Sequence, residues 1–300
     1  MRKSRFLEIC AVFLAAECIY VALYPAILSF GTEHFLGNGD SSLYVWLTWQ
    51  NMRNLLSAKL SFTLPFFYPD ANTLAYSDNY LLPSAVSALV FALSKNFALS
   101  YNLPLLFAAG LNGSAVYSLA RELAGSRLAA LISGLSFMCA PFFFAQVQHP
   151  QLQFAFFIPL LILCLLRVWK YREVSRSAFI GLLLLGAFLC SVYYFYISLL
   201  LVLVLLLIFQ SSSESRLPLK TLLSIFLWNI PALVLLACFA LPYRKVAALE
   251  GTRSIGDITL ALRPASFVSM PFANRVWGEL TAGLTNFETH FGVGLVASIL

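Results

Sequence analysis

Asp40 is the residue of this sequence whose type and position best fit a chemical role. It follows the turn-forming run Gly37-Asn38-Gly39 and precedes residues 41–57, where apolar and polar residues recur with the period of an amphipathic helix. Trp46 and Trp49 would hold such a helix at a membrane surface. A carboxylate at its start could take a proton from an attacking hydroxyl group. The alternative is that Asp40 is only the helix N-cap, where Asp is common.

The stretch from Phe66 to Asp78 is aromatic, rich in turn-forming residues and too polar for a bilayer interior. Sugar rings pack well on aromatic faces such as that of Tyr68, so a carbohydrate site fits this stretch. An ordinary loop with the aromatic residues of a membrane interface fits it as well. Asp78 precedes the apolar run 80–96, and it could bind substrate or cap a helix there.

His149 and Gln153 belong to a second polar group. Residues 146–153 place four glutamines around His149, at the end of an expected spanning helix. The imidazole could bind a phosphate or a metal, and a helix end with solvated amides is the alternative. The three histidines of the sequence form no metal-ligand spacing, so a divalent metal cofactor is left open.

Arg275 and Glu288 lie in a third polar stretch, ahead of the apolar run 291–300. Glu288, with His290, could close a site from its far side, and Arg275 is one of several basic residues that could balance negative charge on a leaving group. The alternative is that Glu288 only leads into the next helix.

The composition requires that membrane helices position these residues. Of the 300 residues, 60% are hydrophobic and 11% are charged, and the mean hydropathy is +0.84. A soluble domain is roughly 45–50% apolar and about 25% charged. These values exclude a soluble globular enzyme, a disordered chain and a nucleic-acid-binding protein. The net charge of +6 is therefore expected to orient the chain in a membrane.

The apolar runs predict an all-α fold, a polytopic transmembrane helix bundle with helices on its outer face. Crossings are expected at 6–30, 98–120, 127–146, 152–168, 177–192, 197–210 and 219–241, with an eighth from 291. The run 177–210 is too long for one crossing of about 30 Å, so we divide it near 193–196. The sequence stops inside an apolar run, so residues 1–300 are expected to be the N-terminal part of one truncated transmembrane domain.

The basic residues predict the orientation of the bundle. If 80–96 lies on the outer face, eleven of the 19 Lys and Arg fall in four inside segments, 1–5, 121–127, 167–177 and 211–220. If 80–96 spans, the basic stretch 167–177 moves outside, against the positive-inside rule. We therefore expect a cytoplasmic N-terminus and two outer loops, about 31–97 and 242–290, although Arg244 and Lys245 then lie outside.

This arrangement resembles the GT-C superfamily of polytopic glycosyltransferases, and a large bacterial group within it. The residues that carry the resemblance are Gly39-Asp40 before the surface helix, Tyr68-Pro69-Asp70-Ala71-Asn72, Arg121-Glu122-Leu123-Ala124-Gly125, Ala140-Pro141 and His149-Pro150-Gln151-Leu152. The resemblance extends over roughly residues 6–300. It implies a cell-envelope enzyme of the bacterial cytoplasmic membrane.

The resemblance also implies the reaction and its partners. A sugar would pass from a polyprenyl-phosphate-type lipid donor to an acceptor on the extracytoplasmic face, and membrane lipid would be the other partner. The catalytic carboxylate of the first outer loop maps to Asp40. No role carries over to the other candidates, so they are substrate-binding candidates from their residue types alone: Tyr68, Asp78, His149, Gln153, Arg275 and Glu288.

The alternative function is that of a polytopic transporter or lipid flippase without transferase chemistry. Such proteins tend to carry internal repeats and broken helices at the middle of the membrane. The sequence has no evident repeat, and its polar residues gather in loops. We therefore expect an enzyme.

Overall fold

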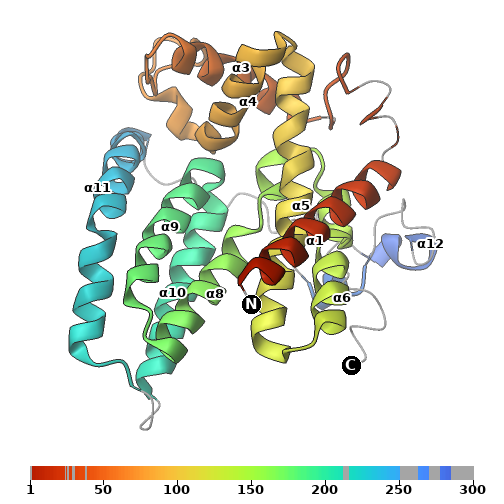
Figure 1. Cartoon of the computed structure of the whole chain (residues 1–300). Helices are drawn as coiled ribbons and strands as arrows, with labels where there is room; N and C mark the ends of the chain where they lie inside the picture. The colour runs from red at the N-terminus through yellow and green to blue at the C-terminus, as the bar shows by residue number, and fades with distance from the viewer. Residues whose placement is uncertain are drawn as a thin grey trace.

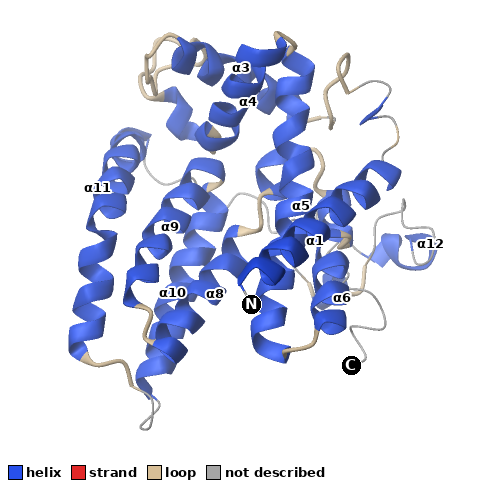
Figure 2. Ribbon diagram, in the orientation of Figure 1, coloured by secondary structure: helices blue, strands red, loops and turns tan. Residues whose placement is uncertain are grey.

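The computed structural model describes residues 2–23, 25, 27–28, 31–37, 39–211, 216–250, 263–269 and 278–284. Within these ranges the protein is all-α, with turns between the helices and no strand (Figure 2). By length and composition, six described segments can cross a membrane: Arg5–Leu23, Phe97–Ala124, Arg127–Ala145, Pro150–Tyr171, Val192–Ser211 and Leu219–Leu249. The expected all-helical, polytopic fold is confirmed at this level.

The α-helices are α1 (Arg2–Leu23), α3 (Ser41–Leu56), α4 (Leu81–Ser94), α5 (Phe97–Ala124), α6 (Arg127–Met138), α7 (Pro141–Ala145), α8 (Phe157–Tyr171), α9 (Ala178–Cys190), α10 (Val192–Ser211), α11 (Leu219–Glu250) and α12 (Gly278–Thr281). Short 3-10 helices are η1 (Thr73–Tyr76), η2 (Pro150–Gln153), η3 (Val174–Ser177), η5 (Pro264–Phe267) and η6 (Ala282–Leu284). In Figure 1, α9, α10 and α11 run side by side, and α3 and α4 lie together at the top.

The four segments predicted to lie inside meet at one end of the bundle. Arg5 and Arg167 both contact Glu122, with N–O distances of 3.3 and 3.0 Å. Arg172 donates a hydrogen bond to the carbonyl of Arg216 at 3.2 Å. We call this end, with Arg5 and residues 121–127, 167–177 and 216–220, the basic end.

The opposite end, which we call the loop end, holds residues 31–37, 39–41, 77–80, 146–149 and 191. Helix α4 belongs to it. The helix has 14 residues, which is about 21 Å, and it is not among the six candidate spans. Asn79, just before α4, donates to the carbonyl of Phe188 at 3.0 Å, and Asn96, just after it, donates to the carbonyl of Thr32 at 2.9 Å. Both ends of α4 are thus tied to residues at one end of the bundle.

The helix predicted over residues 41–57 is present as α3. Its tryptophans are half-buried and pack against other aromatic rings. The ring centroids of Trp46 and Phe66 and those of Trp49 and Phe97 are each 5.1 Å apart. These contacts hold α3 to the 66–78 stretch and to the start of α5.

The division of the run 177–210 differs from the prediction. Ser191 is extended, with φ −149° and ψ 123°, and separates α9 from α10. The tyrosines at 193, 194 and 196 therefore lie in the first turns of α10, and the predicted turn at 193–196 is wrong. Helix α9 has 13 residues and is not among the six candidate spans. Helix α11 runs nine residues beyond the predicted end at 241 and includes Arg244 and Lys245.

Small residues bring the long helices together at the centre. A Cβ atom on Gly134 of α6 would lie 2.5 Å from the carbonyl oxygen of Gly113 in α5. A Cβ atom on Gly113 would lie 3.3 Å from the Cβ of Ala16 in α1. Close contact between backbones is a common way for membrane helices to associate, and it makes α5 the central helix.

Candidate functional site

Asp40 lies directly before the first residue of α3. It occupies the N-cap position, but its side chain makes no capping hydrogen bond. Instead, its Oδ2 lies 3.9 Å from Nδ1 of His149. The Asp40 side chain is 72% exposed and that of His149 is 20% exposed. The carboxylate is therefore not used by the helix and is open to a ligand.

Two glycines allow the turn that holds Asp40 to come close to the turn that holds His149. Gly37 and Gly39 have φ values of 104° and 53°, in the left-handed region that favours glycine. A Cβ on Gly37 would lie 3.1 Å from the carbonyl oxygen of Val147, and one on Gly39 would lie 3.2 Å from Oε1 of Gln148. The turn before α3 thus packs directly on the turn that carries His149.

Asp78 is buried between three elements. Its Oδ1 accepts a hydrogen bond from the backbone N–H of Val192 at 2.5 Å, and its Oδ2 accepts one from the hydroxyl of Tyr44 at 3.4 Å. It is thus a helix cap, but for α10 and not for the helix that follows it in the chain. Burial raises the pKa of Asp78 to about 6, against the lowering effect of the Val192 and Tyr44 hydrogen bonds.

The neighbouring Asn79 and Tyr243 tie the same loop to α9 and α11. The side-chain amide of Asn79 donates to the hydroxyl of Tyr243 at 3.2 Å. That hydroxyl donates to the carbonyl of Ser77 at 2.9 Å. Tyr44 and Tyr243 were not predicted as site residues. Tyr44 had a usable signal, because it follows Asp40 by one helical turn and shares its face.

A cavity of about 840 Å³ opens beside this loop. Its walls come from residues 67–76, Phe188 of α9, the start of α10 and the second half of α11, and they are mostly apolar or aromatic. Asp70 and Arg244 bring charge to it. Val192 and Tyr243 connect it to Tyr44, Asp78 and Asn79, which together with Tyr243 we call the Asp78 cluster. Its volume is in the range of small-molecule sites, roughly 300–1,000 Å³.

The remaining candidates lie apart from this arrangement. Tyr68 is 94% exposed and is not in the cavity wall, although its neighbour Phe67 is. Gln153 is buried, and its amide nitrogen donates to the carbonyls of Phe143 and Gln146 at 3.2 and 3.0 Å. Its side chain therefore holds the turn before α8. Arg275 and Glu288 lie outside the described residues.

Among the residues that the structure describes, no three His, Cys, Asp or Glu side chains come together as metal ligands. Asp40 and His149 have no third such partner within the described part of the chain.

In comparisons with known proteins, no family model, curated protein or solved structure matches this chain. The protein is polytopic and all-helical over its described residues. Its candidate site joins Asp40 and His149 to the Asp78 cluster through α3.

Proposed function

We propose that this protein is a membrane glycosyltransferase of the GT-C type. It would move a sugar from a polyprenyl-phosphate-type lipid donor to an acceptor on the extracytoplasmic face. The observation that carries the proposal is the 3.9 Å approach of His149, from the turn after α7, to the carboxylate of Asp40 at the start of the first large loop. The proposal takes the loop end to be extracytoplasmic, as the positive-inside rule predicts.

In the proposed reaction, an acceptor oxygen attacks the anomeric carbon of the donor sugar. The new bond from carbon to the acceptor oxygen forms as the bond from carbon to the phosphate oxygen breaks. Asp40 takes the proton of the acceptor hydroxyl, and the electron pair leaves with the polyprenyl phosphate. General base catalysis of this kind contributes about 10²–10⁴-fold to a rate. His149, with its Nδ1 3.9 Å from the carboxylate, would pair with Asp40 when its imidazole is protonated.

The 840 Å³ cavity is the proposed donor site. Its aromatic walls suit a sugar ring and its apolar walls suit an isoprenoid chain. Arg244 supplies a guanidinium for the phosphate.

Asp40 does not line the cavity, but hydrogen bonds run from Val192 in the cavity wall through Asp78 to Tyr44, which follows Asp40 by one helical turn in α3. Tyr44, about 6 Å along α3 from Asp40, contacts Asp78. Asp78 in turn holds the backbone amide of Val192 in the cavity wall.

The test is Asp40→Asn in the full-length protein, reconstituted with a panel of polyprenyl-phosphate-linked hexoses and pentoses. We expect the release of labelled sugar from the lipid fraction to fall at least about 100-fold, because the amide cannot accept the proton. The matched control is Glu33→Gln, an exposed carboxylate of the same loop. It should keep the wild-type rate, and both variants should elute as the wild type does.

Equal rates for the wild type and Asp40→Asn would overturn the role of Asp40. Movement of the lipid between leaflets, without release of sugar by any variant, would instead identify a transporter or lipid flippase.

A further inference from the structure

The basic end holds a second cavity, of about 870 Å³, at the far end of the bundle from the proposed donor site. It lies between the start of α1, the end of α5, the start of α6 and the end of α8. Five arginines line it against three glutamates: Arg5, Arg121, Arg127, Arg167 and Arg176 against Glu8, Glu122 and Glu173. The ionised lining therefore has an excess of two positive charges.

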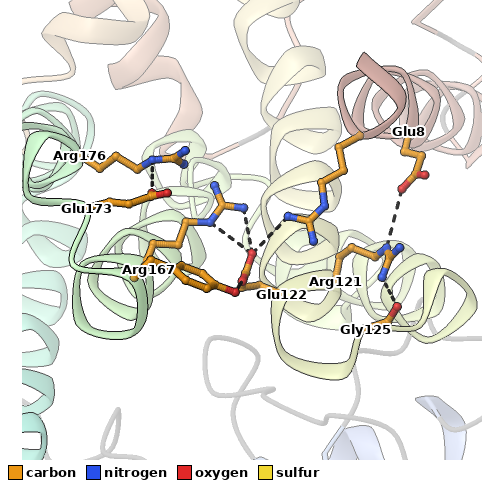
Figure 3. A network of polar contacts seen from close by, with 9 residues as sticks. Glu8, Arg121, Glu122, Gly125, Arg167, Glu173 and Arg176 are labelled. Atoms are coloured by element: carbon orange, nitrogen blue, oxygen red, sulfur yellow. Dashed lines mark hydrogen bonds and ion pairs between the residues drawn. The ribbon is translucent and has the colours of Figure 1, made fainter. Parts of the chain in front are cut away.

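The ion pairs in this cavity leave guanidinium groups available. Glu122 is nearly buried and accepts from Arg5, from Arg167 and from the hydroxyl of Tyr171, at 3.3, 3.0 and 2.8 Å (Figure 3). Its oxygens are thus satisfied by three donors, while each arginine keeps further N–H groups. Glu173 is paired with Arg176, one turn away.

The other half of the cavity is centred on Glu8. Glu8 lies 2.8 Å from the guanidinium of Arg127 and 3.8 Å from Nε of Arg121, and it accepts a hydrogen bond from the hydroxyl of Tyr117 at 2.7 Å. Arg121 donates through one terminal nitrogen to the carbonyl of Gly125 (Figure 3), while its buried Nε has no hydrogen-bond partner among the described residues. The Arg127 side chain is 69% exposed, so it can turn toward a ligand without breaking the core.

The apolar part of the lining points to the kind of ligand. Phe6 and Ile9 of α1 join the arginines in the wall, and Phe6 is mostly exposed. The cavity thus has guanidinium groups beside an apolar surface, at the end of the candidate spans where lipid headgroups lie. Guanidinium groups bind phosphate oxygens in pairs, and basic pockets between membrane helices on the cytoplasmic side bind anionic headgroups.

We propose that this basic cavity binds the phosphodiester headgroup of an anionic phospholipid in the adjoining leaflet. The headgroup phosphate is held between Arg121 and Arg127, and the acyl chains lie along Phe6 and Ile9. This site is independent of the proposed transferase activity, because it shares no residue with the loop end.

The test is lipid binding by the full-length protein in nanodiscs and in native mass spectrometry, with phosphatidylglycerol against phosphatidylcholine. We expect retained phosphatidylglycerol on the wild type and at least about fivefold weaker binding by Arg121→Gln and by Arg127→Gln. The matched control is Arg216→Gln, an exposed arginine of the basic end that does not line the cavity. It should change binding less than about twofold.

Glycerol 3-phosphate in solution separates a lipid from a free phosphate ester. It should not displace phosphatidylglycerol at millimolar concentration, because it lacks the acyl chains. Displacement would assign the cavity to a soluble phosphate ester and overturn the lipid proposal. Equal binding by the wild type and Arg127→Gln would also overturn it. Arg127 is exposed enough for this variant to fold even if Arg121→Gln does not.

Discussion

Asp78 shows how one side chain can serve both packing and chemistry. It is 3% exposed and holds the first amide of α10, so it belongs to the framework of the loop end. It also contacts Tyr44, which follows the proposed base by one turn. A carboxyl group in this position is costly to ionise, because burial removes water from the charged form.

The raised pKa predicts a pH-dependent stability. Between the ordinary value of 3.8 and about 6, the unfolded chain releases the Asp78 proton while the folded chain keeps it. The contribution of Asp78 to folding stability is therefore largest at low pH and falls as pH rises through this window. It should fall by roughly 3 kcal/mol and then stay level.

Chemical unfolding in detergent micelles from pH 4 to 7 measures this contribution as the difference between the wild type and Asp78→Asn. The asparagine can still accept from Val192 but has no proton to release, so the difference should decline with pH. The control Asp70→Asn, a carboxylate that bonds only to Tyr76 in the described structure, should follow the wild-type slope. A difference that stays constant with pH would contradict the raised pKa.

At the scale of helices, the contact between α5 and α6 depends on the absence of side-chain atoms. The two helices meet where Gly134 faces the backbone of Gly113. Because the neighbour is backbone and not the end of a flexible side chain, a larger residue must push the helices apart.

We predict that Gly134→Leu destabilises the protein by about 1–3 kcal/mol or more, as expected for overpacking. Ser136→Leu, two residues further on the exposed face of α6, should cost little. The midpoint of thermal unfolding in detergent compares the two variants. Similar midpoints would mean that α6 does not pack against α5 at this glycine.

The helices were predictable where hydrophobicity and length alone decide them. The amphipathic period predicted the helix α3, and the length of the apolar runs predicted the candidate spans. The break at Ser191 was placed too late, because the sequence 191–196 shows aromatic residues but not the distant cap on Val192. That cap comes from Asp78, 114 positions away, and no local pattern carries such a contact.

The candidate site was predictable only in part for the same reason. The type and position of Asp40 and His149 singled them out, but their approach depends on how two turns pack. Tyr44, Tyr243 and the two cavities arise from helix packing. The glutamines around His149 made Gln153 a binding candidate, but its side-chain amide donates hydrogen bonds to two backbone carbonyls within the turn.

At the scale of the whole molecule, the two ends differ in charge and in the kind of cavity. The basic end carries ion pairs between arginines and glutamates around a cavity beside α1, and the loop end carries an aromatic cavity beside α11. Both proposals depend on which end faces the cytoplasm. The positive-inside rule assigns the basic end to that side.

Cysteine labelling in intact cells tests this orientation. With the exposed Cys18 and Cys238 replaced by alanine, a membrane-impermeant maleimide should label Glu33→Cys at the loop end. It should label Arg216→Cys at the basic end only after the membrane is permeabilised. The reverse pattern would place Asp40 in the cytoplasm and overturn the proposed reaction.

The length of α11 has a consequence for any molecule that enters the loop-end cavity. The helix has 32 residues, which is about 48 Å, whereas the hydrocarbon layer is about 30 Å thick. Its last turns, with Tyr243 and Arg244, can thus project into the interfacial layer of phosphates and water. A ligand held there would straddle two solvents, with its charged part hydrated and its tail still dissolved among acyl chains.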